Sequence, residues 1–242
     1  STQAKTLFPY TTLFRSLFCS PHNPVGRVWR REELEHLLTI ARRHQLVIFS
    51  DEIHADLIYP HQRHIPLATL ALPGDRIVTA MAPSKTFNLP GLGLSYLISS
   101  DPILRDELRE VLAGLHVGNS NPFSLTAAEA AYRHGGDWLD QLMAYLHETQ
   151  QAVTKLLTIE LPKVRVVPAE GTYLLWLDCR GLGLDDGELQ RFFAHEAGLG
   201  LSAGTVFGHG GSGYMRLNIG APRSEIMAAM RKLVAAWQQR CP

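Results

Sequence analysis

The sequence lacks three features that would point to particular classes of protein. It has no net charge, because 23 basic residues balance 23 acidic ones, so no overall field favours nucleic acid or an anionic membrane. No apolar run approaches the roughly 20 residues that a membrane-spanning helix needs. Only three cysteines occur, Cys19, Cys179 and Cys241, and their wide spacing fits a reducing cytosol better than a disulfide scaffold. The composition of the 242 residues favours a cytoplasmic enzyme that acts on a small molecule.

The first sixteen residues differ in character from the rest. They contain Thr-Leu-Phe twice, have no helical or strand period, and resemble the in-frame translation of a sequencing-adapter oligonucleotide. No small-residue cleavage site follows a long apolar core, which argues against a signal peptide. We therefore expect residues 1–16 to be non-native and the native sequence to begin near Leu17. A poorly ordered native terminus is the alternative.

From Leu17 onward, apolar runs alternate with amphipathic segments. The runs predict strands, covered on both faces, over 46–49, 76–80 and 94–98, after a short one at 17–19, and helical periods predict helices over 32–45, 102–115, 124–134 and 138–157. Later runs predict strands over 164–167, 173–177 and 214–219, with helices over 186–197 and 224–239. We expect an α/β fold: an incomplete three-layer large domain with a mainly parallel sheet over 17–150, and a smaller C-terminal α/β domain over 151–242.

Polar side chains follow several of these predicted strands, where ligands of open α/β sheets bind. They are Asn23, the group Asp51 to His54, and Lys85. Each has an ordinary explanation, because Asn-Pro forms turns, aspartate caps helices, and loop lysines are usually solvated. Their order along the chain is the stronger signal.

Four stretches carry a family resemblance: SPHNPVGRVW, SDEIHADLIY, APSKTFNLPGL and YMRLNIGAPRS. Together they resemble the fold-type I enzymes that use pyridoxal 5′-phosphate (PLP), the aminotransferase superfamily. More narrowly they are similar to the PatB/MalY branch of cystathionine β-lyases and cysteine-S-conjugate β-lyases. The resemblance covers Leu17 to about Gln238, and implies PLP as cofactor and an amino-acid thioether as substrate.

The resemblance assigns catalytic roles to two residues. Lys85 matches the lysine that forms an imine with the cofactor and later removes the substrate Cα proton. Asp51 matches the carboxylate that pairs with the pyridine nitrogen and keeps it protonated, so that the ring withdraws electrons from Cα.

Further residues match binding positions of the family. The resemblance implies that Asn23 donates to the ring hydroxyl oxygen, that His54 contacts the cofactor, and that Ser84 binds its phosphate. It implies that Arg216 grips the substrate carboxylate, for which a guanidinium fork is suited. A structural histidine, a turn-capping serine and a structural ion pair are the respective alternatives for His54, Ser84 and Arg216.

Other polar residues are expected to be structural. Arg223 is interpreted as a helix-start or surface residue. His61 and His64 are predicted to be solvated loop histidines, because no third side chain has the spacing of a metal ligand, and no metal site is predicted.

Lyase and aminotransferase chemistry share these residues. Many aminotransferases carry a phosphate-binding arginine eight residues after the lysine, where this chain has Gly93, which agrees with the β-lyase branch. An aminotransferase, the aminotransferase-like domain of a transcription regulator and an inactive fragment are alternatives. The family also implies a homodimer in the full-length parent, and neither nucleic acid nor a membrane is expected as a partner.

Overall fold

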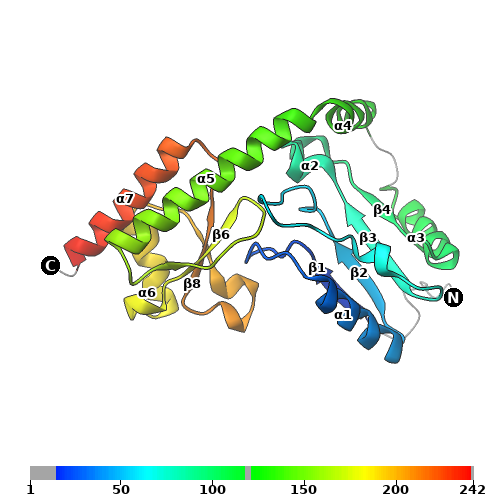
Figure 1. Ribbon diagram of the computed structural model, residues 1–242, viewed down its shortest axis with the longest axis horizontal. Coiled ribbons are helices and arrows are strands. Elements are labelled where there is room, and N and C mark those ends of the chain that lie inside the picture. Colours follow the sequence, from blue (N-terminus) through cyan, green and yellow to red (C-terminus); the bar gives the residue numbers. More distant parts are fainter. Residues whose placement is uncertain (1–14, 118–120, 241–242) are drawn as a thin grey trace. The chain divides into compact units, whose positions relative to one another are not determined.

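The computed structural model describes residues 15–117 and 121–240. These form two compact units (Figure 1). The first contains the residues before His22 together with Val28–Asp56 and Arg63–Leu139, and the second contains His22–Arg27, Leu57–Gln62 and the chain from Asp140 onward. The sequence-based boundary at residue 150 instead falls within helix α5 (Gly136–Glu160), which is continuous and offers no local signal where the units divide.

The first unit contains a four-stranded sheet in the order β1-β2-β3-β4. The strands are β1 (Arg15–Cys19), β2 (Val47–Asp51), β3 (Arg76–Met81) and β4 (Tyr96–Ile98). β1, β2 and β3 are parallel, whereas β4 is antiparallel to β3. Residues 1–14 of the segment predicted to be non-native lie outside the described residues, and its last two residues belong to β1.

Successive strand residues point to opposite sides of this sheet, so its continuous apolar strands place apolar side chains on both faces. Helices cover both of these faces. On one face, Ile48 and Ile77 pack with Leu34 and Leu38 of helix α1 (Arg31–Arg43). On the other face, the preceding strand residue Val47 and the following one Val78 pack with helix α3 (Pro102–Gly114) through Leu104. The arrangement gives the three layers that the sequence predicts for this part of the chain.

The edge strand β4 departs from the prediction. A strand covered on both faces was expected at 94–98, but Leu97 and Ile98 are 38% and 52% exposed. At the opposite edge, Leu17 in β1 is 85% exposed. The expectation of two-sided cover is wrong for β4, because no described element packs over these outer side chains.

The second unit has an antiparallel sheet in the order β5-β6-β8-β7. The strands are β5 (Arg165–Val166), β6 (Leu174–Asp178), β7 (Ser202–Ala203) and β8 (Tyr214–Asn218), and the helices are α5, α6 (Asp186–Arg191) and α7 (Arg223–Arg240). The helix expected over 186–197 ends early as α6 and continues as a π-helical turn over Phe192–Glu196. Phe192 and Phe193 are both fully buried in this turn.

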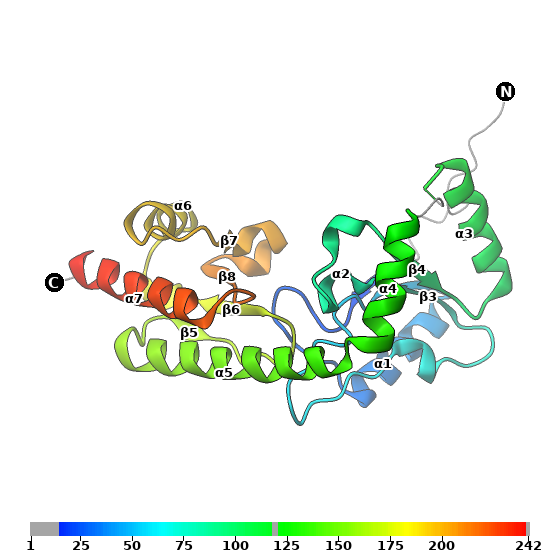
Figure 2. The same ribbon diagram turned by 90° about the horizontal axis from the view of Figure 1, so that it is seen from above.

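Helices α5 and α7 lie side by side in both views (Figures 1 and 2). Arg223, the first residue of α7, joins them: its Nε donates to Thr149 Oγ1 at 3.0 Å and its Nη2 to Glu148 Oε2 at 2.8 Å. Its guanidinium carbon also lies 4.5 Å from the centroid of the Tyr145 ring. Arg223 is therefore the helix-start residue that the sequence predicts.

The core of the second unit contains a buried thiol, Cys179, which is 1% exposed. Burial, followed by the neighbouring charge of Asp178, raises the pKa of Cys179 to about 12. The side chain is consequently protonated at neutral pH.

Among the described residues, no helix is both long enough and apolar enough to cross a membrane.

Acid is expected to destabilise the second unit through Asp178, at the end of β6. Arg180 donates to both carboxylate oxygens, at 2.9 and 2.8 Å, and Arg165 donates to Oδ2 at 2.9 Å. The hydrogen bonds from Arg180 lower the pKa of Asp178 well below its ordinary value. The carboxylate therefore stabilises the fold above the unfolded pKa of about 3.9, and this contribution is lost as pH falls further.

The measurement is urea unfolding of the protein and of Asp178→Asn between pH 7 and pH 3. Asp178→Asn should be less stable at pH 7, and its stability should fall less steeply below about pH 4. Equal slopes for the two proteins would contradict the assignment.

Candidate functional site

Two residues of opposite charge lie at one edge of the parallel sheet. Asp51 is the last residue of β2 and pairs in register with Ala80 of β3. Lys85 belongs to the short helix α2 (Pro83–Thr86), which begins just after β3 ends at Met81. Because parallel strands end at the same edge, the structure places both predicted catalytic residues at the carboxyl edge of the sheet.

Both side chains are half-buried and retain free polar atoms. Asp51 Oδ1 accepts a hydrogen bond from the Ile53 backbone N–H at 3.2 Å. Within residues 15–117 and 121–240, Asp51 Oδ2 and Lys85 Nζ make no hydrogen bond or ion pair. The edge therefore offers an acceptor and an amine that are available to a ligand.

His54 and Ser84 lie beside these two residues in the sequence. His54 is 3% exposed and lies in a turn closed by a hydrogen bond from Ala55 N to Glu52 O at 2.8 Å. Ser84 lies inside α2, whose N-cap is Ala82, and no side-chain hydrogen bond caps that helix. The capping alternative for Ser84 has no support in this geometry, and the cofactor-binding roles of Ser84 and His54 stay predictions.

Glu52 is a buried carboxylate that the sequence analysis did not single out. Its side chain accepts from Ser50 Oγ at 2.8 Å and from Leu67 N at 3.1 Å, and it lies 2.7 Å from His64 Nε2. His64 is 6% exposed in its side chain, so the expectation of a solvated loop histidine is wrong. His64 can be buried because its imidazole contacts the buried carboxylate of Glu52 at the end of β2.

No metal site is evident at this position. Among the described residues, no group of three or more histidine, cysteine, aspartate or glutamate side chains is arranged to hold a metal ion.

The second unit brings together Asn23 and Arg216, which are far apart in the sequence. Arg216 Nη1 donates to Asn23 Oδ1 at 2.9 Å, and Nη2 donates to Ser202 Oγ at 3.1 Å. An arginine only donates, so this contact fixes the amide: Oδ1 faces Arg216, and Nδ2 is left to donate elsewhere. Arg216 Nε is buried and has no hydrogen-bond partner among the described residues.

Two neighbours of Arg216 were not predicted from the sequence. Ser202 lies in the two-residue strand β7, directly opposite Arg216 of β8. Phe207 lies with its ring centroid 4.8 Å from the guanidinium carbon. A strand of two residues has no readable period, so the strand register that pairs Ser202 with Arg216 gave no sequence signal.

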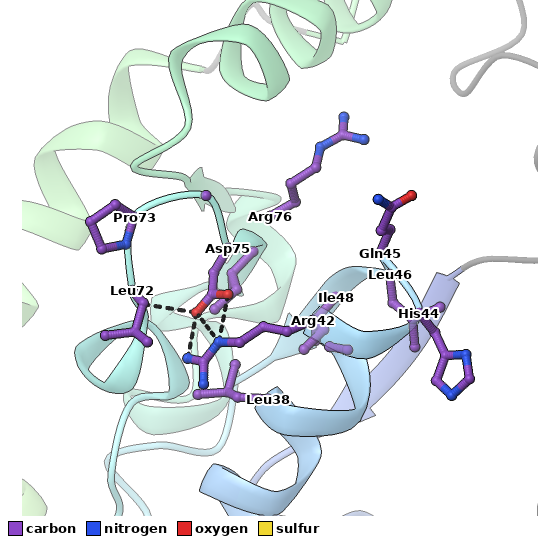
Figure 3. Close-up of a pocket in the computed structure, with 13 residues that line it drawn as sticks. Leu38, Arg42, His44, Gln45, Leu46, Ile48, Leu72, Pro73, Asp75 and Arg76 are labelled. Carbon is purple, nitrogen blue, oxygen red and sulfur yellow. Dashed lines mark hydrogen bonds and ion pairs between the residues drawn. The ribbon is translucent and has the colours of Figure 1, made fainter.

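A pocket of about 700 Å³ lies elsewhere in the first unit. It is lined by the end of α1 and by the beginnings of β2 and β3, at the amino edge of the sheet (Figure 3). Arg42 and Asp75 face each other there, joined by hydrogen bonds of 2.7 to 3.2 Å. None of the predicted site residues lines this pocket.

Comparison with known proteins identifies the family of the chain. The family model for aminotransferase class I and II matches residues 16–233. The chain therefore belongs to the aminotransferase class I and II family, as the four sequence motifs indicate.

Three relatives show where in the family it lies. The chain is 40% identical over 235 residues to cystathionine beta-lyase PatB of Bacillus subtilis, covering 97% of this chain and 60% of that protein. It is similar to the PLP-bound putative aminotransferase of Clostridium difficile 630 (TM-score 0.90, 39% identity, 93% of this chain and 58% of the other). It is also similar to the PLP-bound C-S lyase of Staphylococcus hominis (TM-score 0.85, 34% identity, 93% and 55%). The chain thus spans somewhat more than half the length of these relatives.

Proposed function

We propose that the chain is part of a PLP-dependent carbon–sulfur β-lyase, which cleaves cystathionine or a related cysteine S-conjugate to a thiol, pyruvate and ammonia. The observation that carries this proposal is the placement of Lys85 and Asp51 at the carboxyl edge of adjacent parallel strands, with Lys85 Nζ and Asp51 Oδ2 unbonded to described residues. The similarity to PatB supports the lyase branch.

The residues at this edge fit PLP. An aldehyde needs a primary amine that is not held in an ion pair, and Lys85 Nζ is such an amine among the described residues. A pyridine nitrogen needs a carboxylate oxygen, and Asp51 Oδ2 is available. Lys85 and Asp51 therefore match the two groups of the cofactor that take part in the chemistry, the aldehyde and the pyridine nitrogen.

When bound, PLP supplies an electron sink for the negative charge that develops at the substrate Cα. Lys85 would remove the Cα proton, and its half-buried position would limit competition from water. Asp51 would hold a proton on the ring nitrogen through Oδ2, while its Oδ1 accepts the hydrogen bond from the Ile53 backbone N–H.

Arg216 and Asn23 are proposed as binding residues. With Nη1 and Nη2 each committed to one internal hydrogen bond, Arg216 still has its Nε proton and one further proton on each Nη for a substrate carboxylate. The contact with Arg216 leaves Asn23 Nδ2 as a donor to the ring hydroxyl oxygen. The hydrogen bond from Arg216 thus orients the side-chain amide of Asn23, which the sequence motif predicts to bind the cofactor.

An aminotransferase is the second candidate, because the PLP-bound structure from Clostridium difficile has that description. Gly93 weighs against it. Gly93 has a φ of 62°, in the left-handed region, at the end of a 3₁₀ turn (Pro90–Leu92). An arginine at this position would be strained in this conformation, which fits a chain that lacks that phosphate-binding side chain.

We further propose that a protein containing this chain acts as a cytoplasmic homodimer on a small-molecule substrate. Exposed apolar side chains on α3 and on α4 (Pro122–His134) support a partner surface, with Ile103 69% and Phe123 76% exposed. For the regulator alternative, upstream genomic sequence that encodes a helix-turn-helix domain would be the deciding observation.

The proposed function is tested by adding PLP, reducing with borohydride and mapping the adduct by peptide mass spectrometry. We expect a visible absorption band before reduction, and an adduct on Lys85 afterwards. The other lysines, Lys5, Lys155, Lys163 and Lys232, are internal controls in the same digest. Lys85→Ala should abolish both signals.

Cystathionine then separates the two candidates. Pyruvate formed without an oxo-acid acceptor supports the β-lyase, whereas turnover that requires an acceptor supports the aminotransferase. An adduct spread over the other lysines, and equally strong in Lys85→Ala, would contradict the proposal.

A further inference from the structure

We propose that Asp56 is a positioning residue for Lys85 and acts through the hydroxyl group of Thr86. The proposal rests on the proposed function, since it concerns the reacting lysine. Thr86 Oγ1 donates to Asp56 Oδ2 at 3.0 Å, and Thr86 is only 1% exposed. Thr86 directly follows Lys85, so the hydrogen bond acts on the neighbouring peptide unit.

This hydrogen bond joins the two segments that carry the proposed catalytic residues. The turn after β2 starts at Asp51, whose Oδ1 accepts from Ile53 N, and it ends at Asp56. The backbone link between these strand ends stops earlier, at the hydrogen bond from Glu52 N to Ala80 O. Beyond that point, within the described part of the chain, the hydrogen bond between Thr86 and Asp56 links the side chains of helix α2 and the Asp51 turn.

Aromatic packing holds the residue after Thr86. The Phe87 ring lies edge-on to Tyr132, with centroids 5.3 Å apart, and 6.4 Å from Trp138. A Cβ added to Gly135 would lie 2.7 Å from Phe87 Cε1, so the ring packs directly against the backbone at the end of α4. Phe87 therefore cannot shift toward α4.

Helix α2 needs such contacts, because a helix of four residues is too short to hold its own conformation. Thr86 and Phe87 are fixed, whereas Ser84 Oγ and Lys85 Nζ make no hydrogen bond with the described residues. The helix is thus anchored at its carboxyl end and leaves its reactive groups free. Losing the Asp56 contact should let α2 open without removing any group that touches the cofactor or substrate.

The experiment compares Thr86→Val, which is nearly isosteric and lacks the hydroxyl, with Thr86→Ser, which keeps it. Asp56→Ala removes the acceptor and Asp56→Asn keeps one. Amide hydrogen exchange at Phe87 and Leu89, whose N–H groups donate to Pro83 O and Ser84 O, reports opening of α2. We expect about tenfold faster exchange in Thr86→Val and Asp56→Ala, the factor that corresponds to one net hydrogen bond.

The behaviour of Lys85 is the readout that a merely structural role would not change. Competitive labelling with acetic anhydride gives its reactivity relative to Lys155 and Lys163 without any cofactor. We expect the relative reactivity of Lys85 to change about threefold or more in Thr86→Val and in Asp56→Ala, and to recover in Thr86→Ser. The double variant Thr86→Val/Asp56→Ala should show no further change in this reactivity. PLP capture at Lys85 should slow in the same variants. Thr39→Val, an exposed threonine bonded within α1, is the matched control.

Faster exchange with unchanged Lys85 reactivity would overturn the positioning role, and so would unchanged exchange. A different result would contradict the proposed function alone. If Lys85 labelling responds to Thr86→Val but the parent protein captures no PLP at Lys85, the positioning role of Asp56 is supported and the cofactor assignment is wrong.

Discussion

Asp51→Ala is expected to lower β-lyase turnover by roughly 10²- to 10⁴-fold while the fold stays intact. Removing one member of a buried pair costs about 3–5 kcal/mol, and this cost appears only when the ring nitrogen is bound. In the free protein, Asp51 Oδ1 accepts one hydrogen bond, from Ile53 N, so its loss should destabilise the fold by only about 1 kcal/mol. Pyruvate formation from cystathionine and urea unfolding measure the two effects.

The charge of Asp51, and not only its size, should matter. Asp51→Asn keeps the shape and an acceptor oxygen but cannot balance a protonated ring nitrogen, so its turnover should fall nearly as far as in Asp51→Ala. Asp106→Asn is the matched control, because the side chain of this aspartate is 70% exposed and forms an ion pair with Arg109 within its own helix. Full turnover in Asp51→Asn would remove the proposed role.

Glu52→Leu is expected to destabilise the first unit by about 3–5 kcal/mol, the second large effect. Leucine fills much of the volume but leaves His64 Nε2, Leu67 N and Ser50 Oγ without the acceptor that they share. Unsatisfied buried donors, and not a cavity, are the expected cause. Urea unfolding gives the total loss, and hydrogen exchange along β2 and β3 shows where it arises.

Two further variants separate this cause from poor packing. Glu52→Gln keeps an acceptor for Leu67 N and should lose less stability than Glu52→Leu. The double variant Glu52→Leu/His64→Leu removes the stranded imidazole and should recover part of the loss. If the double variant is less stable than Glu52→Leu, unpaired polar groups are not the cause. Glu35→Gln, at an exposed helical position, should stay within about 0.5 kcal/mol of the parent.

The placement of the proposed catalytic pair could be predicted from the sequence because its signal is local. Lys85 and Asp51 each follow an apolar run within a few residues, and runs of this kind in an α/β chain become parallel strands that end at one edge. The helices were also predicted within a few residues, since their apolar periods are long. Family motifs then supplied the roles.

Contacts between distant residues could not be predicted in this way. The pairing of Ser202 with Arg216 depends on the register of β7 against β8, and the contact of Asp56 with Thr86 depends on the turn after β2. His64 was misassigned for the same reason, because its partner Glu52 lies 12 positions away and is buried by the strand end. Each of these interactions is decided by tertiary packing.

Cys179 has a consequence for the proposed β-lyase, whose reaction would release a thiol at every turnover. A thiol product that has been oxidised to its disulfide can exchange with an accessible cysteine, which gives a mixed disulfide and releases one thiol. The attacking protein sulfur must be a thiolate for this exchange. The raised pKa of Cys179 keeps this side chain protonated at pH 7. The sulfur is also 1% exposed, so oxidised product can hardly reach it. The core of the second unit therefore carries a cysteine that would be protected against disulfide exchange with the oxidised product of the proposed reaction.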